Sequence, residues 1–375
     1  MTIAAWALLA LAGLGCLTGI VSIWAVGRRF AHAEPAVAPE PVTLLRPLHG
    51  AEPGLAERLS ALLAQDYGAP VQLVCGVAQA DDSAAEVVRA LQAAHPAADI
   101  ALIVDPARHG SNAKVSNLIN MLAAARHDLL VLSDSDIAVG PDWVRRVTAA
   151  LAQPGVGAVT ALYVGMPAVP DIWARLAAMG VSYQFLPGVC LGIETGLAHP
   201  CMGSTIALRR ATLDAIGGLP RVADVLADDY KIGRAVRALG LTVAVPPFAV
   251  RHMHFEASLA ALWRQELRWA RTVRGLDPAG YAGQLLTYPV PLALVAVVLG
   301  SGTLAAFAVL LGALLVRIAL KYRIDAATGT SSGPVWLLPM RDMISLAVWA
   351  GCYFVRSVDW RGARHRLHAD GTMIR

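Results

Sequence analysis

The sequence predicts an α/β fold, a mostly parallel sheet with helices between its strands, flanked by apolar segments at both ends of the chain. Three observations predict it. Short apolar runs alternate with helical stretches from residue 42 to about residue 250. An uncharged apolar segment occupies residues 3–26, which exceeds the roughly 20 residues that span a bilayer. Further apolar segments follow residue 284.

The composition favours contact with lipid. The mean hydropathy is +0.54 and 15% of the 375 residues are charged, against about 25% in an ordinary soluble domain. The net charge of +4 gives no sign of nucleic-acid binding and suits anionic lipid headgroups or ligand phosphates. The five cysteines are scattered and form no C-x-x-C pair, so a disulfide framework or zinc site is not expected. A reducing, cytoplasmic location fits the soluble part best.

The first apolar segment is expected to be a transmembrane anchor over residues 1–27. Trp6 and Trp24 stand near its ends, where interfacial aromatic residues are common, and two arginines follow at once, which places the C-terminal side in the cytoplasm. A cleaved signal peptide is the competing interpretation, because residues 31–33 resemble a cleavage site. The absence of a basic start and the length of the apolar stretch favour an uncleaved anchor.

A Pro/Ala-rich linker over 28–41 leads into a predicted catalytic domain over 42–280. Its expected strands are VTLLRP, VQLVCGVAQ, DIALIVD, DLLVLSD and VGAVTALYV. Ligands of such sheets bind at the carboxyl ends of the strands. The acidic residues that follow the strands are therefore the first candidates for chemistry.

The C-terminal membrane region, 281–375, is expected to begin with two short spans in a helical hairpin, broken at 300–302. A later apolar stretch, 336–355, contains Arg341 and Asp342, which are costly in lipid, so we expect it to be partly interfacial or re-entrant. Lys321, Arg323 and the arginine-rich tail all favour the cytoplasm. Three full crossings cannot satisfy both basic groups, and the number of crossings stays open.

The clearest chemical pattern is Asp134-x-Asp136 at the end of an apolar strand. Two carboxylates one residue apart can converge on one hard cation, which can bridge the phosphates of a nucleotide donor. The other interpretation is a polar turn after the strand, where aspartate is common.

Two further acidic pairs follow. Asp81 and Asp82 precede a helix at Ser83, where they would cap the helix, contact a donor nucleotide, or do both. Asp228 and Asp229 stand together ahead of another helical pattern, and mutual repulsion can raise a carboxyl pKa towards values useful in a general base. We favour Asp229 for that role.

Basic and amide residues supply two more candidates. Lys114 lies between Asn112 and Asn117, a set that suits phosphate or uracil contacts, although a solvated loop lysine is the plain alternative. Residues 256–274 predict an amphipathic helix that lies on the membrane surface, with Leu259, Leu262 and Val273 on its apolar face. Its arginines follow at helical spacing, and it carries Gln265, Arg268 and Trp269 in the order Q-x-x-R-W.

Taken in order, D-D, D-x-D, D-D-Y and Q-x-x-R-W resemble the motifs of lipid-directed and processive glycosyltransferases of family 2 type, which have a GT-A fold. The resemblance narrows to ceramide glucosyltransferase-like enzymes of family 21 on LLRPLHGAEPGL, NAKVSNL, SDSDI and ADDY. It is greatest for the bacterial hopanoid-associated branch, on KVSNLIN, LAHPCMGSTIALRR, LADDY, LWRQELRWART and WRGARHRL. The likeness extends over nearly the whole chain.

The resemblance implies an inverting transfer from a UDP-sugar to a lipid hydroxyl on the cytoplasmic side of the bacterial inner membrane. Asp229 would be the base, Asp134 would bind a metal (Mg²⁺ or Mn²⁺) with the diphosphate, and Asp82 would contact the nucleotide. The Q-x-x-R-W residues would close over the diphosphate and the acceptor. The donor-binding set implied here is Asp81, Asp82, Asn112, Lys114, Asn117, Gln265, Arg268 and Trp269, with Asp136 as a possible second metal ligand.

Three departures from the ceramide enzymes favour the hopanoid branch: Ser83, Ser116 and Asp136 replace proline, asparagine and glycine. That branch implies transfer of N-acetylglucosamine to bacteriohopanetetrol. A ceramide glucosyltransferase using UDP-glucose is the first alternative, and a non-catalytic membrane scaffold that binds lipid is a remote one. The C-terminal membrane region is too small for the secretion channel of a processive synthase.

Overall fold

The computed structural model describes residues 2–33, 36–300 and 302–355, together with the backbone of three short strands, Ser357–Trp360, Ala363–Leu367 and Met373–Ile374. The side chains of the predicted basic tail lie outside the described residues. The chain divides into two compact units. We call His32–Tyr163 with His199–Met253 the sheet unit, and Met1–Ala31 with Val164–Ala198 and His254–Arg375 the helical unit.

A seven-stranded sheet in the order β3-β2-β1-β4-β8-β6-β9 forms the centre of the sheet unit. The strands are β1 (Val42–Pro47), β2 (Val71–Val77), β3 (Asp99–Val104), β4 (Leu129–Leu132), β6 (Val156–Thr160), β8 (Ile206–Arg209) and β9 (Thr242–Ala244). Neighbouring strands from β3 to β4 are parallel, whereas β8 is antiparallel to both β4 and β6. The sheet is therefore mixed and mostly parallel, as the sequence predicts.

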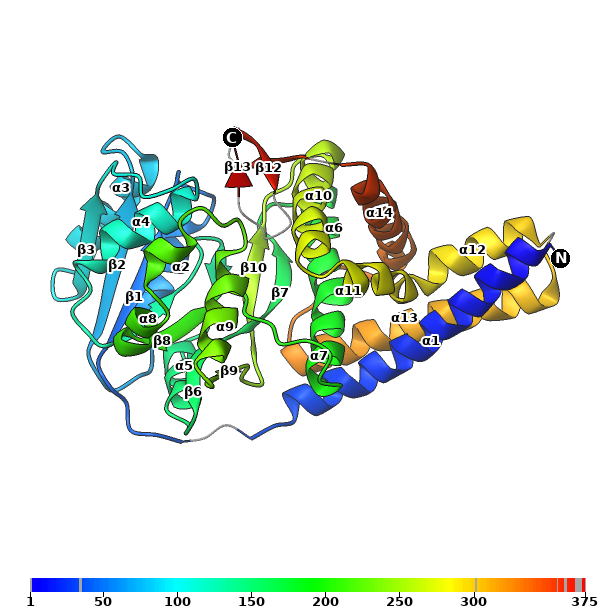
Figure 1. Ribbon diagram of the computed structural model, residues 1–375, viewed down its shortest axis with the longest axis horizontal. Coiled ribbons are helices and arrows are strands. Elements are labelled where there is room, and N and C mark those ends of the chain that lie inside the picture. The colour runs from blue at the N-terminus through cyan, green and yellow to red at the C-terminus, as the bar shows by residue number, and fades with distance from the viewer. Residues whose placement is uncertain are drawn as a thin grey trace. The chain divides into compact units, whose positions relative to one another are not determined.

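Helices cover both faces of this sheet, because successive strand residues point to opposite sides. Leu44 and Val131 pack in one core with α2 (Leu55–Leu63), α3 (Ser83–Ala94) and α5 (Trp143–Leu151). Their neighbours Leu45 and Leu130 pack in a second core on the opposite face. The helices of that second core are α4 (Ala113–Leu122), α8 (Arg210–Ala215), η2 (Leu219–Val222) and α9 (Asp228–Ala238) (Figure 1).

A small second sheet follows the D-x-D sequence. It has the order β5-β10-β7, with β5 at Ile137–Ala138, β10 at Ala249–His254 and β7 at Leu162–Pro167. β5 and β10 are antiparallel, and Ile137 pairs with His252. This pairing brings β10 alongside the residues that end β4.

The helical unit is almost entirely α-helical over the residues described. Its helices are α1 (Ile3–Phe30), α6 (Ile172–Gly180), η1 (Val181–Phe185), α7 (Leu186–Glu194), α10 (Leu259–Leu276), α11 (Pro278–Gly283), η3 (Gln284–Thr287), α12 (Pro289–Leu299), α13 (Leu304–Thr328), η4 (Val335–Leu337), α14 (Leu338–Gly351) and η5 (Cys352–Phe354). Within the described ranges, four segments are long and apolar enough to cross a membrane: Ile3–Phe30, Ile172–Glu194, Leu304–Thr328 and Val335–Phe354. The second of these was not expected from the sequence.

Helices α1, α12 and α13 form one bundle (Figure 1). Leu9 of α1 packs with both Ala296 and Ala306, and Ala12 packs with Ala293. Further along α1, Gly19 faces Val316. Along α1, the residue numbers of its contacts on α13 increase, whereas the residue numbers of its contacts on α12 decrease. Helix α1 therefore runs parallel to α13 and antiparallel to α12.

This arrangement gathers basic residues at one end of the bundle. The start of α1 and the turn between α12 and α13 lie together at the uncharged end. Arg28 and Arg29 stand at the opposite end and bind Glu194 of α7 at 2.9 and 3.5 Å, and Arg323 lies beside Gly27 there. The predicted hairpin thus returns the chain to the side of the bundle on which α1 ends.

Close contact in the bundle depends on glycine. A Cβ at Gly19 would lie 2.5 Å from Cγ1 of Val316, whereas a Cβ at Gly13 would meet nothing within 4 Å. Gly19→Leu should therefore force α1 and α13 apart and lower the thermal unfolding midpoint in detergent, at a cost of about 1–3 kcal/mol. The matched control Gly13→Leu should unfold like the parent chain. Equal midpoints for the two variants would contradict the packing.

Candidate active site

The D-x-D loop is shaped by a buried guanidinium beneath it. Arg46 of β1 donates to Oγ of Ser133 at 2.7 Å, to the main-chain oxygen of Ile137 at 2.6 Å and to that of Asp134. Burial lowers the pKa of Arg46 to about 10, although Asp136 opposes the shift, so the group stays charged at neutral pH. Arg46 therefore fixes the loop and places a positive charge under its carboxylates.

The second carboxylate of the loop has a partner of its own. Oδ2 of Asp136 lies 3.0 Å from Nε2 of His252 on β10, and the main-chain oxygen of Asp136 accepts from Met253 at 2.9 Å. Arg58 of α2 donates to the main-chain oxygen of Ser135 at 2.8 Å. Each residue of the D-x-D loop is thus held by a different neighbouring element.

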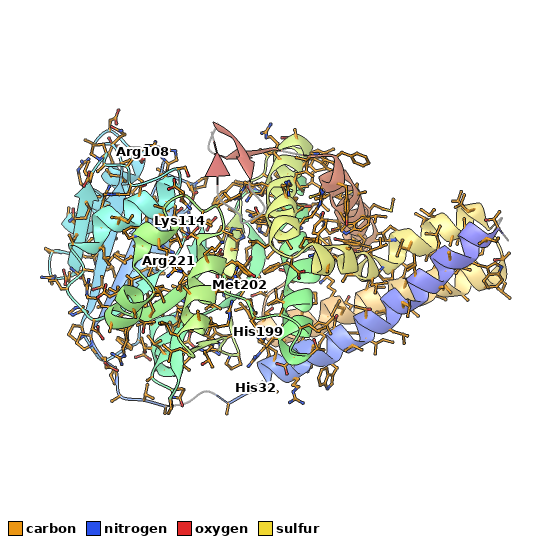
Figure 2. All side chains as sticks on the ribbon, in the orientation of Figure 1. His32, Arg108, Lys114, His199, Met202 and Arg221 are labelled. Atoms are coloured by element: carbon orange, nitrogen blue, oxygen red, sulfur yellow. The ribbon has the colours of Figure 1, made fainter. Side chains whose placement is uncertain are left out.

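Lys114 joins two of the predicted acidic motifs. It lies in the first turn of α4 (Figure 2), and its Nζ is 2.7 Å from Oδ1 of Asp134 and 3.6 Å from Oδ2 of Asp228. Burial alone would lower the pKa of Lys114, but Asp134 and Asp228 outweigh it and raise that pKa overall. The plain alternative of a solvated loop lysine is therefore wrong, because the ammonium is bound between carboxylates.

Asp229 has the environment that general base catalysis requires. Its Oδ2 accepts from the main-chain N–H of Gly203 at 2.7 Å, and its Oδ1 accepts from the N–H of Tyr230 at 2.7 Å. Burial, followed by repulsion from Asp228, raises the pKa of Asp229 to about 6, while Lys114 and the two N–H groups oppose the rise. The carboxylate is thus oriented, ionised at neutral pH and more basic than an exposed aspartate.

Gly203 marks the centre of the site. A Cβ on this residue would lie 3.2 Å from Nζ of Lys114 and 3.3 Å from Oδ2 of both Asp134 and Asp229. Its position is fixed by its neighbour Met202, whose main-chain N–H and oxygen both bond to Oγ1 of Thr160, at 2.8 and 3.0 Å; Figure 2 labels Met202 and Lys114. Three charged groups from separate elements therefore approach one main-chain position that carries no side chain.

The other predicted residues of the sheet unit make structural contacts. Oδ1 of Asp82 accepts from Ala84 and from Gly50, each at 2.9 Å, so its capping role is confirmed. Asn112 caps α4 and donates to the main-chain oxygen of Val225 at 2.8 Å. Buried Asn117 donates to the main-chain oxygen of Gly76 at 2.7 Å. Donor contacts for these residues and for exposed Asp81 stay predictions.

The Q-x-x-R-W residues form one group on α10 of the helical unit. Nη2 of Arg268 donates to Oε1 of Gln265 at 3.1 Å. The Arg268 guanidinium lies 5.9 Å from the ring centre of Trp269, and that ring meets His254 edge-on at 6.2 Å. The spacing of the motif therefore brings Arg268 beside both Gln265 and Trp269.

A divalent cation fits the chemistry of the D-x-D loop. Carboxylate oxygens are the ligands that Mg²⁺ and Mn²⁺ prefer, and Mg²⁺ commonly binds one or two carboxylates together with substrate phosphates. Within the described part of the chain, no three His, Cys, Asp or Glu side chains gather as a ready-made metal site. Asp134 and Asp136 therefore suit a metal that binds together with a phosphorylated ligand.

Comparison with known proteins identifies the family. The model of glycosyl transferase family 21 matches residues 7–373. The chain belongs to this family. The predicted GT-A type fold is also confirmed, since a mixed α/β sheet occurs together with an N-terminal apolar helix and C-terminal apolar helices. The resemblance read from the motifs is thereby confirmed at the level of the family, and the hopanoid branch stays a prediction.

Two curated relatives of this family 21 chain come from Caenorhabditis elegans. Ceramide glucosyltransferase 1 is 25% identical over 247 residues, or 63% of this chain and 51% of the relative. Ceramide glucosyltransferase 3 is 24% identical over 238 residues, or 61% of this chain and 50% of the relative. The chain spans about half the length of these curated relatives.

Two solved structures have a distant likeness. The mannosyltransferase PcManGT from Pyrobaculum calidifontis, in complex with GDP-Man and Mn²⁺, has a TM-score of 0.49 and 21% identity, with 94% of each chain covered. S. aureus TarS in complex with UDP-GlcNAc has a TM-score of 0.40 and 14% identity, covering 90% of this chain and 99% of that one. Both are too distant to assign a substrate or a residue role.

The close approach of these groups to Gly203 can be tested directly. Gly203→Ala should lower sugar transfer about 100-fold, because the added methyl group lies between Lys114, Asp134 and Asp229. Gly140→Ala is the matched control: its Cβ would also approach a neighbour, Asp142, at 3.2 Å, but away from these groups. Thermal unfolding of both variants should match the parent chain. Full activity in Gly203→Ala would mean that the reacting groups lie elsewhere.

Proposed function

We propose that this family 21 protein transfers a sugar from a UDP-sugar to a lipid hydroxyl, with inversion at the anomeric carbon. The observation that carries the proposal is the approach of three groups to Gly203: a carboxylate of raised pKa, an ammonium group and a D-x-D carboxylate. These are the groups that a proton abstraction coupled to loss of a diphosphate requires.

In the proposed reaction Asp229 removes the proton of the acceptor hydroxyl as its oxygen attacks the anomeric carbon of the sugar. The bond from that carbon to the diphosphate oxygen breaks, and UDP leaves with its electron pair. The pKa of about 6 leaves Asp229 ionised at neutral pH. Each oxygen of Asp229 accepts a hydrogen bond from a main-chain N–H group. The carboxylate is therefore oriented by the backbone and not by a flexible side chain.

The leaving diphosphate needs positive charge nearby. Lys114 and the buried Arg46 supply it from the sheet unit, and we assign Arg268 a similar role because a guanidinium matches phosphate geometry better than an ammonium does. Asp134, with help from Asp136, would hold a divalent cation. Such an ion supplies Lewis-acid stabilisation of the diphosphate when bound.

The apolar helices of the helical unit support the proposal that the acceptor is a lipid. The bundle of α1, α12 and α13 places Arg28, Arg29 and Arg323 together at one end, so we assign that end to the cytoplasm. We propose bacteriohopanetetrol as acceptor, N-acetylglucosamine as sugar and the bacterial inner membrane as location, on the motif resemblance described above. Ceramide with UDP-glucose is the second candidate, supported by the names of the two curated relatives.

Four pairings of donor and acceptor separate these candidates. The purified full chain in lipid nanodiscs would receive UDP-N-acetylglucosamine or UDP-glucose, together with bacteriohopanetetrol or ceramide, and lipid products would be measured by mass spectrometry. We expect one new glycolipid, from bacteriohopanetetrol and N-acetylglucosamine. Glucosylceramide alone would establish the second candidate. No glycolipid in any pairing, with intact UDP-sugar, would contradict the transfer itself.

Asp229→Asn should lower turnover by about 10²–10⁴-fold, the usual contribution of a general base, while UDP binding persists. In the parent chain turnover should fall as the pH drops through about 6, because the raised pKa of Asp229 means that its carboxylate becomes protonated there. The residual activity of Asp229→Asn should lack this acid limb. Near-normal turnover in the variant would make Asp228 the next candidate.

Metal dependence follows from the two carboxylates of the D-x-D loop. Exhaustive treatment with EDTA should abolish transfer, and added Mg²⁺ or Mn²⁺ should restore it, since Asp134 and Asp136 alone repel a diphosphate. Asp134→Asn should fail to recover with either ion. Full activity after chelation would instead indicate that Lys114 and Arg268 neutralise the diphosphate without a metal.

A further inference from the structure

Helix α14 has its polarity reversed. Arg341 and Asp342 are fully buried and Ser345 is nearly so, whereas Met340 and Met343 are exposed. Further exposed residues follow at helical spacing before and after these two, in η4 and η5 as well as in α14. The exposed residues are Trp336, Met340, Met343, Ala347 and Phe354. Trp336 is 70% exposed and Phe354 is 88% exposed. We call these five residues the outer face of α14.

Its buried side is a set of complete ion pairs. Arg341 donates to both carboxylate oxygens of Glu266 on α10, at 2.6 and 2.7 Å. Asp342 accepts from Nη2 and Nε of Arg317 on α13, at 2.7 and 2.8 Å. The charged pair that the sequence placed in an apolar stretch is thus satisfied inside the protein. Because both charged side chains are paired within the protein, the rest of the helix can face an apolar medium.

We infer that α14 lies in the plane of the membrane surface and does not cross it, with its outer face among the lipid acyl chains. In water this helix and the turns that flank it would expose several large apolar side chains and bury a charged pair, the reverse of what a soluble surface favours. Against lipid the same distribution is favourable, since the apolar side chains of the outer face leave water.

Helix α14 contacts a segment that is bent away from the spanning helices. Nε1 of Trp349 donates to the main-chain oxygen of Tyr281 at 2.8 Å, and the Tyr281 hydroxyl donates back to the oxygen of Trp349 at 3.0 Å. Tyr281 belongs to α11, and the segment Pro278–Thr287 is bent by 64° from α12. In Figure 1, α14 likewise runs across the direction of the α1, α12 and α13 bundle. Helix α14 therefore contacts both the bent segment, through Trp349, and α13, through Asp342.

The position of α14 beside α10 bears on the prediction that α10 itself rests on the membrane surface. Leu262, predicted to face the headgroups, is fully buried, so that prediction is wrong because protein covers the residue. α14 runs parallel to α10, since Arg341 binds Glu266 and Arg274 donates to the oxygen of Cys352 at 2.6 Å. The helix that carries Q-x-x-R-W is thus fastened to a helix whose other side contacts lipid.

Nitroxide labels would measure the depth of α14 in the bilayer. Met340→Cys, Met343→Cys, Ala347→Cys and Phe354→Cys would each be labelled in the full chain, with the five native cysteines replaced by alanine or serine, and reconstituted in phosphatidylcholine–phosphatidylglycerol vesicles. Val104→Cys, on an exposed apolar residue of the sheet unit, is the matched control for a label in water. Relaxation by oxygen and by a water-soluble nickel chelate would be compared at each site.

We expect all four outer-face labels to favour oxygen over nickel at the same depth within a few Å, while the control favours nickel. A crossing helix would instead give depths that change steadily, by about 21 Å over the 14 residues from Met340 to Phe354 at 1.5 Å per residue. That gradient would overturn the inference. So would strong nickel contact at all four sites, or shielding from both reagents with spin–spin broadening, which would indicate a second copy of the chain. None of these outcomes depends on the sugar or the acceptor.

Discussion

One ammonium group holds the candidate site together. Four carboxylates, Asp134, Asp136, Asp228 and Asp229, approach one another around the ends of β4 and α9 in the sheet unit. Burial of like charges favours protonation, as the raised pKa of Asp229 illustrates. Lys114 bridges Asp134 and Asp228, and its positive charge opposes the rise in the pKa of Asp229. The rest of the site, including Gly203, is arranged around this contact.

Buried charges are also paired in the helical unit, where the surrounding medium is expected to be lipid. There Arg317 pairs with Asp342 and Arg341 pairs with Glu266, while the exposed side chains on the outer face of α14 are apolar. Pairing is what permits charge inside a protein that faces lipid. In each unit, buried charged groups thus lie beside partners of opposite charge.

Much of this could be predicted from local sequence. An acidic residue after an apolar run indicated Asp134, because ligands bind at the carboxyl ends of such strands, and an acidic pair ahead of a helical pattern indicated Asp229. Arg46, His252 and Gly203 were missed, because their roles depend on contacts across the sheet that no local pattern encodes. A charge within the otherwise apolar strand VTLLRP was the one available sign of Arg46. The candidate span Ile172–Glu194 was also missed, because its apolar composition does not separate a membrane span from a core helix, and 61% of its apolar window is buried.

The most direct test of this charge balance is calorimetric titration of the full chain in detergent with UDP in the presence of Mn²⁺. The parent chain would be compared with Lys114→Met, and Lys114→Arg would serve as the control that keeps the charge. The account predicts at least about ten-fold weaker binding in Lys114→Met, or about 1.4 kcal/mol, with partial recovery in Lys114→Arg. Equal dissociation constants for the parent chain and Lys114→Met, both folded, would contradict it.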